Sequence, residues 1–148
     1  MDYNFYMNEA LKLAKKAYKK DEVPVGAIIV KENKILARAF NLRQSKRRAT
    51  YHAEILAINK ACKKLKDFRL NGATIFVTLE PCAMCLGAIM NARIETLVFG
   101  ASANKENVIS CSELAERCGL NHNLKIIKDV QKEECEKLIT SYFAEKRK

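Results

Sequence analysis

The chain has 148 residues, 49% of them hydrophobic, and its 27 Lys and Arg against 17 Asp and Glu give a formal net charge of +10. This length fits one domain, residues 1–148, and no apolar run reaches the about 20 residues that span a bilayer, which excludes a membrane-spanning helix. The N-terminal stretch lacks the pattern of a secretory signal, so we expect a cytoplasmic protein. The positive charge fits a polyanionic partner such as nucleic acid and fits equally well lysines that merely keep the protein soluble.

The first part of the chain predicts a helix, a hairpin and a loop. Apolar residues recur at helical spacing from Met7 to Tyr18. The runs VGAIIV and KILARAF flank residues 31–33 and are typical of a β-hairpin. The turn type stays open, because the turn has no glycine. From Asn41 to Tyr51 the chain is polar and basic, which predicts a loop.

The remaining sequence alternates helices and strands. The predicted elements are a helix from His52 to Leu65, the strand ATIFVTL, a helix from Cys82 to Ala92, the strand ETLVFG, a short helix from Ser112 to Arg117, the strand LKII and a helix from Gln131 onward. Strand 74–79, helix 82–92 and strand 96–100 form a βαβ unit, which implies parallel pairing. The order predicts an α/β fold with a mixed sheet covered by helices.

Two of these helices carry predicted apolar stripes. In the helix that starts at His52 the stripe contains Ile55, Ile58 and Cys62. In the last helix the stripe consists of Cys135, Leu138, Ile139, Tyr142 and Phe143. We expect both stripes to face the core.

The stretch TLEPCAMCLGAIM places two thiols, Cys82 and Cys85, directly behind Pro81 at a predicted helix start. At this spacing they share a helix face, and a helix N-terminus favours the thiolate form. A lone C-x-x-C also occurs in cores, redox pairs and structural zinc sites. His52 starts another predicted helix, and convergence of the two N-termini would create a zinc site with three protein ligands and an open fourth position.

Glu54 follows His52 by two residues in HAEI, close to the predicted metal but free to remain unligated. A carboxylate in that place can carry protons between water and a substrate. The combined pattern H-x-E…P-C-x-x-C is the signature of zinc-dependent nucleobase deaminases. Together the two motifs favour a catalytic zinc centre over packed thiols.

The other cysteines and the second histidine point to no second site. In a reducing compartment disulfides are not expected, and we predict that Cys62 and Cys135 are buried structural thiols. Cys111, Cys118 and His122 match no common zinc-finger spacing. Two packed thiols and a surface histidine are therefore favoured over a second metal site or a redox disulfide.

At these motifs the chain resembles the bacterial tRNA adenosine deaminase family of the cytidine deaminase-like superfamily. The segments that carry the resemblance are EVPVGAIIV, HAEILAI, TLEPCAMCLGAIMNARI, Phe99-Gly100 and GLNH. It implies a three-layer α/β/α fold with a central mixed five-stranded sheet. The roles that it implies are zinc binding by His52, Cys82 and Cys85, proton transfer by Glu54, nucleoside binding by Asn41 and a position near the tRNA for Lys105.

The resemblance also implies a reaction, hydrolytic deamination of adenosine to inosine at the wobble position of a tRNA anticodon, and a homodimer. The basic residues Arg43 and Arg47 suit contacts with the phosphates of an anticodon stem-loop. The alternatives are a deaminase of a free base or nucleoside, such as guanine or cytosine, and a non-catalytic RNA-binding module with a structural zinc. The TLEPC motif argues against a deaminase of a free base or nucleoside. The presence of Glu54 argues against a non-catalytic module, because a structural zinc site has no use for that carboxylate.

Two segments depart from the family pattern. Arg48-Ala49-Thr50-Tyr51 stands where the family usually has Asp-Pro-Thr-Ala before its histidine. Ala103 stands where it usually has an acidic residue, and ENVISCS follows instead of a loop of small residues. These positions lie on the substrate side and leave the metal positions intact. They leave open the tRNA and the base that are edited.

Overall fold

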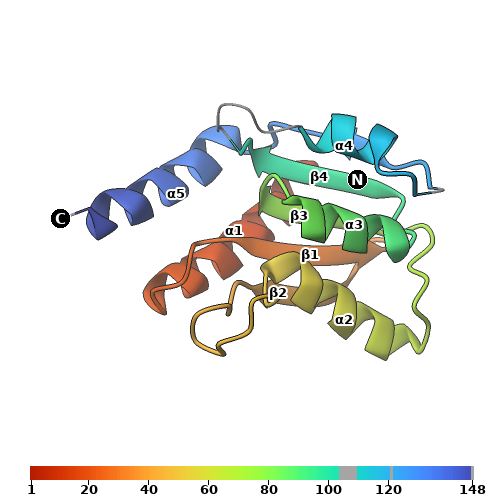
Figure 1. Ribbon diagram of the computed structural model, residues 1–148, viewed down its shortest axis with the longest axis horizontal. Coiled ribbons are helices and arrows are strands. Elements are labelled where there is room, and N and C mark those ends of the chain that lie inside the picture. The colour runs from red at the N-terminus through yellow and green to blue at the C-terminus, as the bar shows by residue number, and fades with distance from the viewer. Residues whose placement is uncertain (104–109, 121, 148) are drawn as a thin grey trace.

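The computed structural model describes residues 1–103, 110–120 and 122–147, and its elements follow the predicted order (Figure 1). The helices are α1 (Tyr3–Lys19), α2 (Ala53–Leu65), α3 (Ala83–Asn91), α4 (Cys111–Arg117) and α5 (Lys132–Lys146). The strands are β1 (Gly26–Lys31), β2 (Lys34–Phe40), β3 (Thr74–Leu79), β4 (Thr96–Ala101) and β5 (Lys125–Ile127). Within these ranges, no helix has both the length and the apolar character needed to cross a membrane.

The strands form one mixed sheet in the order β2-β1-β3-β4-β5. β1 pairs antiparallel with β2 and with β3, whereas β3 pairs parallel with β4 and β4 with β5. The predicted βαβ unit is thereby confirmed as β3-α3-β4. Because β1 runs against both of its neighbours, the carboxyl ends of β2, β3 and β4 lie at the same edge of the sheet as the start of β1. The segments that follow these three strands therefore meet at that edge.

The turn between β1 and β2 consists of Glu32 and Asn33, with φ angles of 52° and 60°. Positive φ at both central residues is the mark of a type I′ turn, whose twist matches that of the flanking strands. Asparagine adopts this conformation more readily than most residues, but glutamate has no such preference. The sequence left the turn type open because neither position is a glycine.

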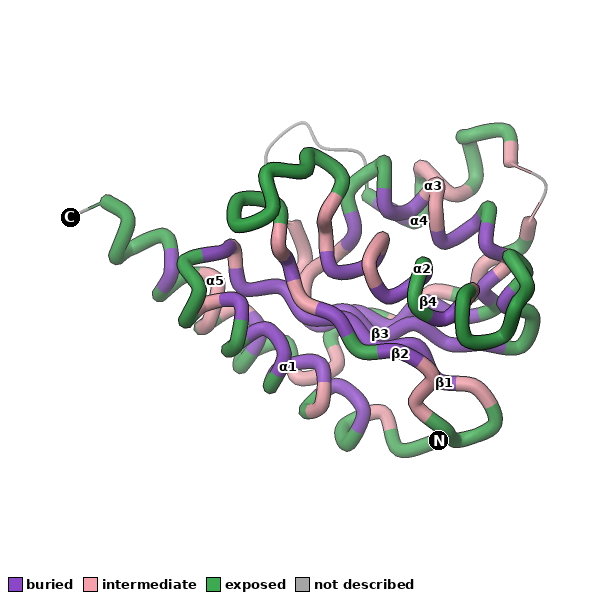
Figure 2. Tube along the Cα trace, turned by 90° about the horizontal axis from the view of Figure 1, so that it is seen from below, coloured by how far each residue is buried: buried purple, intermediate pink, exposed green. Residues whose placement is uncertain are grey.

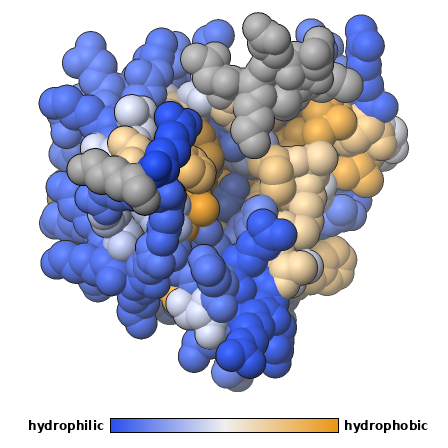
Figure 3. Space-filling model, turned by 60° about the vertical axis from the view of Figure 1, so that its left-hand side comes forward, coloured by the Kyte–Doolittle hydropathy of each residue, from blue (hydrophilic) through white to orange (hydrophobic). Residues whose placement is uncertain are grey.

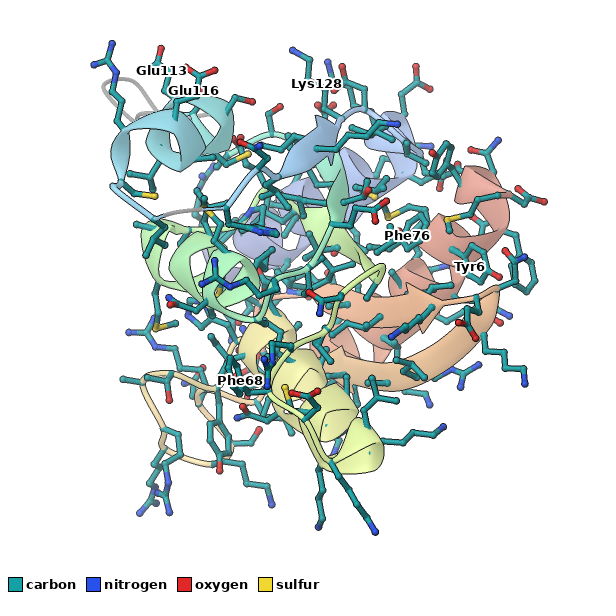
Figure 4. The ribbon with its side chains drawn as sticks, turned by 90° about the vertical axis from the view of Figure 1, so that its right-hand side faces the viewer. Tyr6, Phe68, Phe76, Glu113, Glu116 and Lys128 are labelled. Carbon is teal, nitrogen blue, oxygen red and sulfur yellow. The ribbon has the colours of Figure 1, made fainter. Side chains whose placement is uncertain are left out.

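Helices cover both faces of the sheet in a three-layer α/β/α arrangement, as predicted (Figure 2). α1 and α5 lie on one face, and α2 and α3 lie on the other, with α4 beside α3. Each face has its own apolar cluster. On the α1 side, the ring of Tyr6 lies 5.3 Å from that of Phe76 in β3 (Figure 4). On the other side, Leu86 and Ile89 of α3 pack with Leu97 of β4.

α1 lies unusually close to β1 because the contact is made at a glycine. A Cβ atom on Gly26 would lie 2.1 Å from the carbonyl oxygen of Ala10 and 2.6 Å from the amide nitrogen of Ala14. The backbone nitrogen of Gly26 also donates a hydrogen bond to Thr78 of the neighbouring strand, at 3.2 Å. This close approach packs the middle of α1 against the start of β1.

The buried face of α2 differs from the predicted stripe. Its buried apolar residues are Ala53, Ala57, Ile58 and Ala61. Ile55 is only partly buried and does not belong to the core-facing stripe, whereas Cys62 packs against the core cluster but is partly rather than fully buried. A face built largely of alanine allows the helix backbone to lie close to β1 and β2, and larger side chains are displaced to its sides.

The predicted stripe of α5 also needs correction. Only Cys135 and Tyr142 of that stripe are buried, whereas Phe143 is 41% exposed. The helix crosses the end of the sheet and projects beyond it, as Figure 1 shows, so that one side of its last turns has no sheet beneath it. Cys118 is likewise exposed rather than packed, while Cys111 is buried as expected.

Candidate metal centre and pocket

Two helix N-termini meet at the edge of the sheet where β2 and β3 end. His52 is the N-cap residue of α2 and Cys82 is the N-cap residue of α3. Neither side chain makes a capping hydrogen bond to its own helix, so both are available for other contacts. α2 and α3 pack side by side on one face. The predicted convergence of the two N-termini is therefore present, with Cys82 one position before the first helical residue.

The ligand atoms of His52, Cys82 and Cys85 lie within 4.8 Å of one another. His52 Nδ1 is 3.7 Å from Cys82 Sγ and 3.5 Å from Cys85 Sγ. A tetrahedral zinc with ordinary Zn–N and Zn–S bonds separates its ligand atoms by about 3.5 Å, so the spacing fits that metal. Among the described residues this is the one group of three or more His, Cys, Asp and Glu side chains with metal-binding spacing.

The two thiols divide into one that ionises easily and one that does not. The pKa of Cys82 is lowered to about 5, chiefly because the Cys85 thiol donates a hydrogen bond to it, with further help from His52. The same hydrogen bond, together with burial, raises the pKa of Cys85. A thiolate and an imidazole nitrogen thus face the same point, which is the donor set that zinc prefers.

Glu54 lies in the first turn of α2 and is only 4% exposed. Burial raises the pKa of its carboxyl group to about 7, with an additional contribution from the nearby Cys82. The carboxyl group is also hydrogen-bonded to the Cys85 thiol. A carboxyl group beside a metal centre with a pKa near neutrality can both accept and donate protons during a reaction.

The cluster opens into a cavity of about 1400 Å³ at the same edge of the sheet. Its lining includes His52, Glu54 and Cys82, but Cys85 lies beneath them and is fully buried. Figure 3 shows the hollow in this face, with apolar surface beside it and hydrophilic residues around it. A cavity with apolar walls and a few convergent polar groups is typical of a small-molecule or nucleobase site.

Asn41 lines the cavity at the point where the chain leaves β2. It is 7% exposed, and both ends of its amide are held by the backbone. Nδ2 donates to the carbonyl oxygen of Val23 at 3.3 Å, and Oδ1 accepts from the backbone nitrogen of Arg43 at 3.1 Å. The side chain predicted to contact substrate is therefore fixed in orientation at the cavity wall.

Of the three residues predicted to contact RNA, the structure describes two. Arg43 and Arg47 are exposed and line the mouth of the cavity. They belong to the basic loop, which we define as residues 43–48 and which also contains Lys46 and Arg48. Lys105 lies outside the described residues. The structure thus brings the two arginines to the same opening as the metal cluster.

Two acidic residues at the cavity had no predicted role. Glu22 accepts hydrogen bonds from the basic loop, and Glu80 accepts from the backbone nitrogens of Ala103 at 3.0 Å and Cys111 at 2.9 Å. Both residues stand in quoted motifs, EVPVGAIIV and TLEPC. An acidic residue inside a motif next to apolar residues was the available signal. Their loop-binding roles depend on contacts between distant segments.

One side of α5 also lines the cavity, which the sequence reading missed. The residues concerned are Glu136, Ile139, Thr140, Phe143 and Arg147. Their helical spacing was visible in the sequence, but two of them were assigned to a core-facing stripe. The exposed part of α5 therefore forms a wall of the pocket with apolar and basic side chains.

Cys111, Cys118 and His122 do not form a second cluster in the described part of the chain. Cys118 Sγ lies 3.8 Å from the sulfur of Met90, and Cys111 and Cys118 are both free thiols. His122 Nε2 is 2.6 Å from the carbonyl oxygen of Ile94, so it connects the segment before β5 to the segment between α3 and β4.

Comparison with known sequences identifies close relatives. Residues 1–143 match the sequence profile of MafB19-like deaminases. The tRNA-specific adenosine deaminase of Bacillus subtilis (strain 168) is 46% identical over 147 residues, covering 97% of this chain and 89% of the relative. That of Aquifex aeolicus (strain VF5) is 40% identical over 148 residues, covering 99% of this chain and 97% of the relative.

Comparison with solved structures points in the same direction. A structure from work on A-to-I editing by tRNA:A34 deaminases at the wobble position of transfer RNA has a TM-score of 0.85 and 36% identity, covering 90% of this chain and 98% of that one. Guanine deaminase from Bacillus subtilis has a TM-score of 0.66 and 33% identity, covering 81% and 71%. The sequence relatives are named tRNA-specific adenosine deaminases, and the structure with the higher TM-score comes from work on tRNA:A34 deaminases.

Proposed function

This chain belongs to the tRNA-specific adenosine deaminase family, and we propose on that basis that it hydrolyses adenosine to inosine at the wobble position of a tRNA anticodon. The observation that carries the proposal is the group of His52, Cys82 and Cys85 beside the buried Glu54 at one end of the large cavity. We further propose that residues 1–148 form a single deaminase domain and that the enzyme acts in the cytoplasm, together with its tRNA.

We propose that zinc is the metal and that His52, Cys82 and Cys85 are its protein ligands. The spacing of their ligand atoms and the low pKa of Cys82 support this assignment. Three protein ligands leave one position for water or substrate, as in catalytic zinc sites. When bound, zinc would supply a water molecule activated as a nucleophile at neutral pH.

Glu54 moves the protons of the reaction. Its carboxylate accepts a proton from water as the water oxygen bonds to C6 of the adenine ring, and it delivers that proton to the ring nitrogen next to C6. Glu54 then transfers the other proton of the water, from the oxygen now bonded to C6, to the amino group. The amino group leaves as ammonia when the C6–N bond breaks. The burial of Glu54 keeps bulk water from competing for these protons.

Asn41 and the basic loop bind the rest of the substrate in this proposal. The fixed amide of Asn41 offers a hydrogen-bond partner to the nucleoside at the cavity wall. Arg43 and Arg47 at the mouth face the phosphates that flank the splayed-out base. Lys105 is proposed as a further RNA contact on the strength of the motif alone.

A charge-reversal experiment tests the RNA substrate. Replacing Arg43 and Arg47 together by Glu should raise KM for an anticodon stem-loop by about tenfold or more, because phosphate contacts are lost, while kcat changes little. The matched control reverses Lys63 and Lys64, which are exposed at the far end of α2. Wild-type affinity should also fall with salt, with a slope of about 0.7 per neutralised phosphate.

Free guanine, cytosine and adenosine serve as competing substrates in the same assay. The structural similarity to a guanine deaminase makes guanine the base to compare first. Fast turnover of a free base that is insensitive to salt, with none on the stem-loop, would overturn the proposed substrate. Equal KM values for the two charge-reversal proteins would remove Arg43 and Arg47 from RNA binding.

We propose a homodimer as the active assembly, with tRNA contacted by both subunits. The family to which the chain belongs carries this proposal. Light scattering at micromolar concentration should give twice the mass of one chain. A monomer that remains fully active on tRNA at that concentration would contradict the proposal.

A further inference from the structure

Glu22 is a buried carboxylate whose hydrogen bonds all lead to the basic loop. It is 1% exposed and lies between the end of α1 and the start of β1. Oε1 accepts from the backbone nitrogen of Gln44 at 2.9 Å, and Oε2 accepts from the backbone nitrogen of Ser45 at 2.5 Å. The Ser45 hydroxyl donates to the same Oε2. Three donors from two consecutive loop residues thus meet one carboxylate.

This carboxylate is held in its charged form. Burial alone would raise the pKa of Glu22, but the hydrogen bonds from Ser45 and Gln44 lower it below the usual range of a glutamate. Hydrogen bonds to an ionised acceptor are roughly twice as strong as those between neutral groups. The contact with Glu22 is therefore a strong attachment of the loop to the body of the protein.

The position of Glu22 is itself fixed from several directions. Its backbone nitrogen donates to the carbonyl oxygen of Ala17 at 3.0 Å, which closes the turn that ends α1. The preceding residue, Asp21, is tied to α5, because its carbonyl oxygen accepts from the Tyr142 hydroxyl at 3.1 Å and its carboxylate pairs with Lys146. The junction of α1 and β1 is thus bound on one side to α5, through Asp21, and on the other side to the basic loop, through Glu22.

The basic loop needs such an attachment, because it is exposed and strongly charged. All six of its residues are exposed, and four are cations, Arg43, Lys46, Arg47 and Arg48. Like charges so close in sequence repel one another and favour an extended, mobile segment. Arg47 also has a φ of 53°, a conformation that is costly for a residue other than glycine.

We propose that Glu22 is a positioning residue for RNA binding: it holds the basic loop at the mouth of the cavity so that Arg43 and Arg47 are presented to the phosphates of the substrate. The inference rests on the proposed RNA substrate. It adds the residue that determines where Arg43 and Arg47 meet the RNA phosphates. Glu22 acts through the loop, and its carboxylate is already occupied by loop donors.

Glu22→Gln tests the inference with little change of shape. A glutamine amide offers one acceptor oxygen, and its NH2 group would face a backbone N–H donor. The matched control is Glu32→Gln, which changes the net charge by the same amount at the exposed β1–β2 turn, at the opposite end of the hairpin. Ser45→Ala is the second variant, because it removes only the hydroxyl donor from an exposed loop residue.

The first readout is limited trypsin digestion, which reports on the loop without any assay of activity. In Glu22→Gln, cleavage within residues 43–48 should be roughly tenfold faster than in Glu32→Gln, because the loop is released. Ser45→Ala should show a smaller increase at the same sites. Equal cleavage rates in Glu22→Gln and Glu32→Gln would overturn the attachment of the loop by Glu22.

The second readout is kinetics on the anticodon stem-loop. In Glu22→Gln, KM should rise about tenfold while kcat and metal content stay close to wild type, since a displaced loop weakens phosphate contacts but not chemistry. A parallel loss of kcat, metal and thermal stability would show a merely structural role and overturn the inference. Faster loop cleavage in a protein whose wild type does not act on RNA would instead refute the proposed function.

Discussion

Glu54→Gln should abolish turnover and leave the metal in place. The amide keeps the size of the carboxyl group but cannot accept a proton from water or return one to the base. General acid–base groups contribute about 100- to 10,000-fold, and because Glu54 handles every proton of the reaction we expect the upper end of that range or beyond. Single-turnover rates on the stem-loop and metal analysis of the same sample measure both parts.

Glu113→Gln is the matched control for this prediction, since Glu113 is an exposed acidic residue on α4 (Figure 4). It should retain full activity and metal. Retained activity in Glu54→Gln would remove Glu54 from the mechanism. Loss of metal in Glu54→Gln would show instead that the carboxylate acts as a ligand, contrary to the assignment of three protein ligands.

Loss of any one metal ligand should remove both the metal and the activity. Cys82→Ala and His52→Ala each leave two protein ligands, and affinity should fall steeply because the remaining donors no longer define a tetrahedral site. Metal content after dialysis should be close to zero in both proteins. The expected activity loss is as large as that of Glu54→Gln.

Cys118→Ala provides the comparison, because Cys118 is an exposed thiol outside the cluster. It should bind as much metal as the wild type and remain active. Full metal occupancy in Cys82→Ala, with normal coordination, would refute the ligand assignment. Loss of metal in Cys118→Ala would point to a ligand set that includes the α4 region.

Much of the fold was predictable because its elements are encoded locally. Most helices and strands have a periodic apolar pattern or a β-branched run, and His52 and Cys82 stand at the starts of helices that follow β2 and β3, two strands that end at the same edge of the sheet. The motif spacing therefore predicted that the side chains of His52, Cys82 and Cys85 lie close together, and the structure shows their ligand atoms within 4.8 Å of one another. The fold class follows from the alternation of elements for the same reason.

What the sequence did not predict depends on contacts between distant segments. Glu22 meets Gln44 and Ser45, which are 22 and 23 positions away, and its place beside the apolar residues of EVPVGAIIV marks it as unusual without naming these partners. The stripe of α5 was misassigned because helical periodicity identifies a face but not its partner. Phe143 lies where α5 has left the sheet, so an apolar residue became part of the pocket wall.

The two glutamates at the cavity have the same kind of contact, because each accepts hydrogen bonds from backbone nitrogens of a segment that lines the cavity. Glu22 holds the basic loop, while Glu80 holds the chain on either side of residues 104–109 through Ala103 and Cys111. Of the departures from the family pattern, Arg48-Ala49-Thr50-Tyr51 follows the first attachment in sequence, and Ala103 is itself part of the second.

The most direct test of the account is to locate the product in RNA. The zinc-loaded protein is incubated with an anticodon stem-loop that carries adenosine at the wobble position and at other positions of the loop, and the RNA is digested and sequenced by mass. The account predicts inosine at the wobble position alone, formed by the wild-type protein and not by Glu54→Gln. Absence of inosine in the RNA, with deamination of free guanine or cytosine by the same preparation, would contradict it.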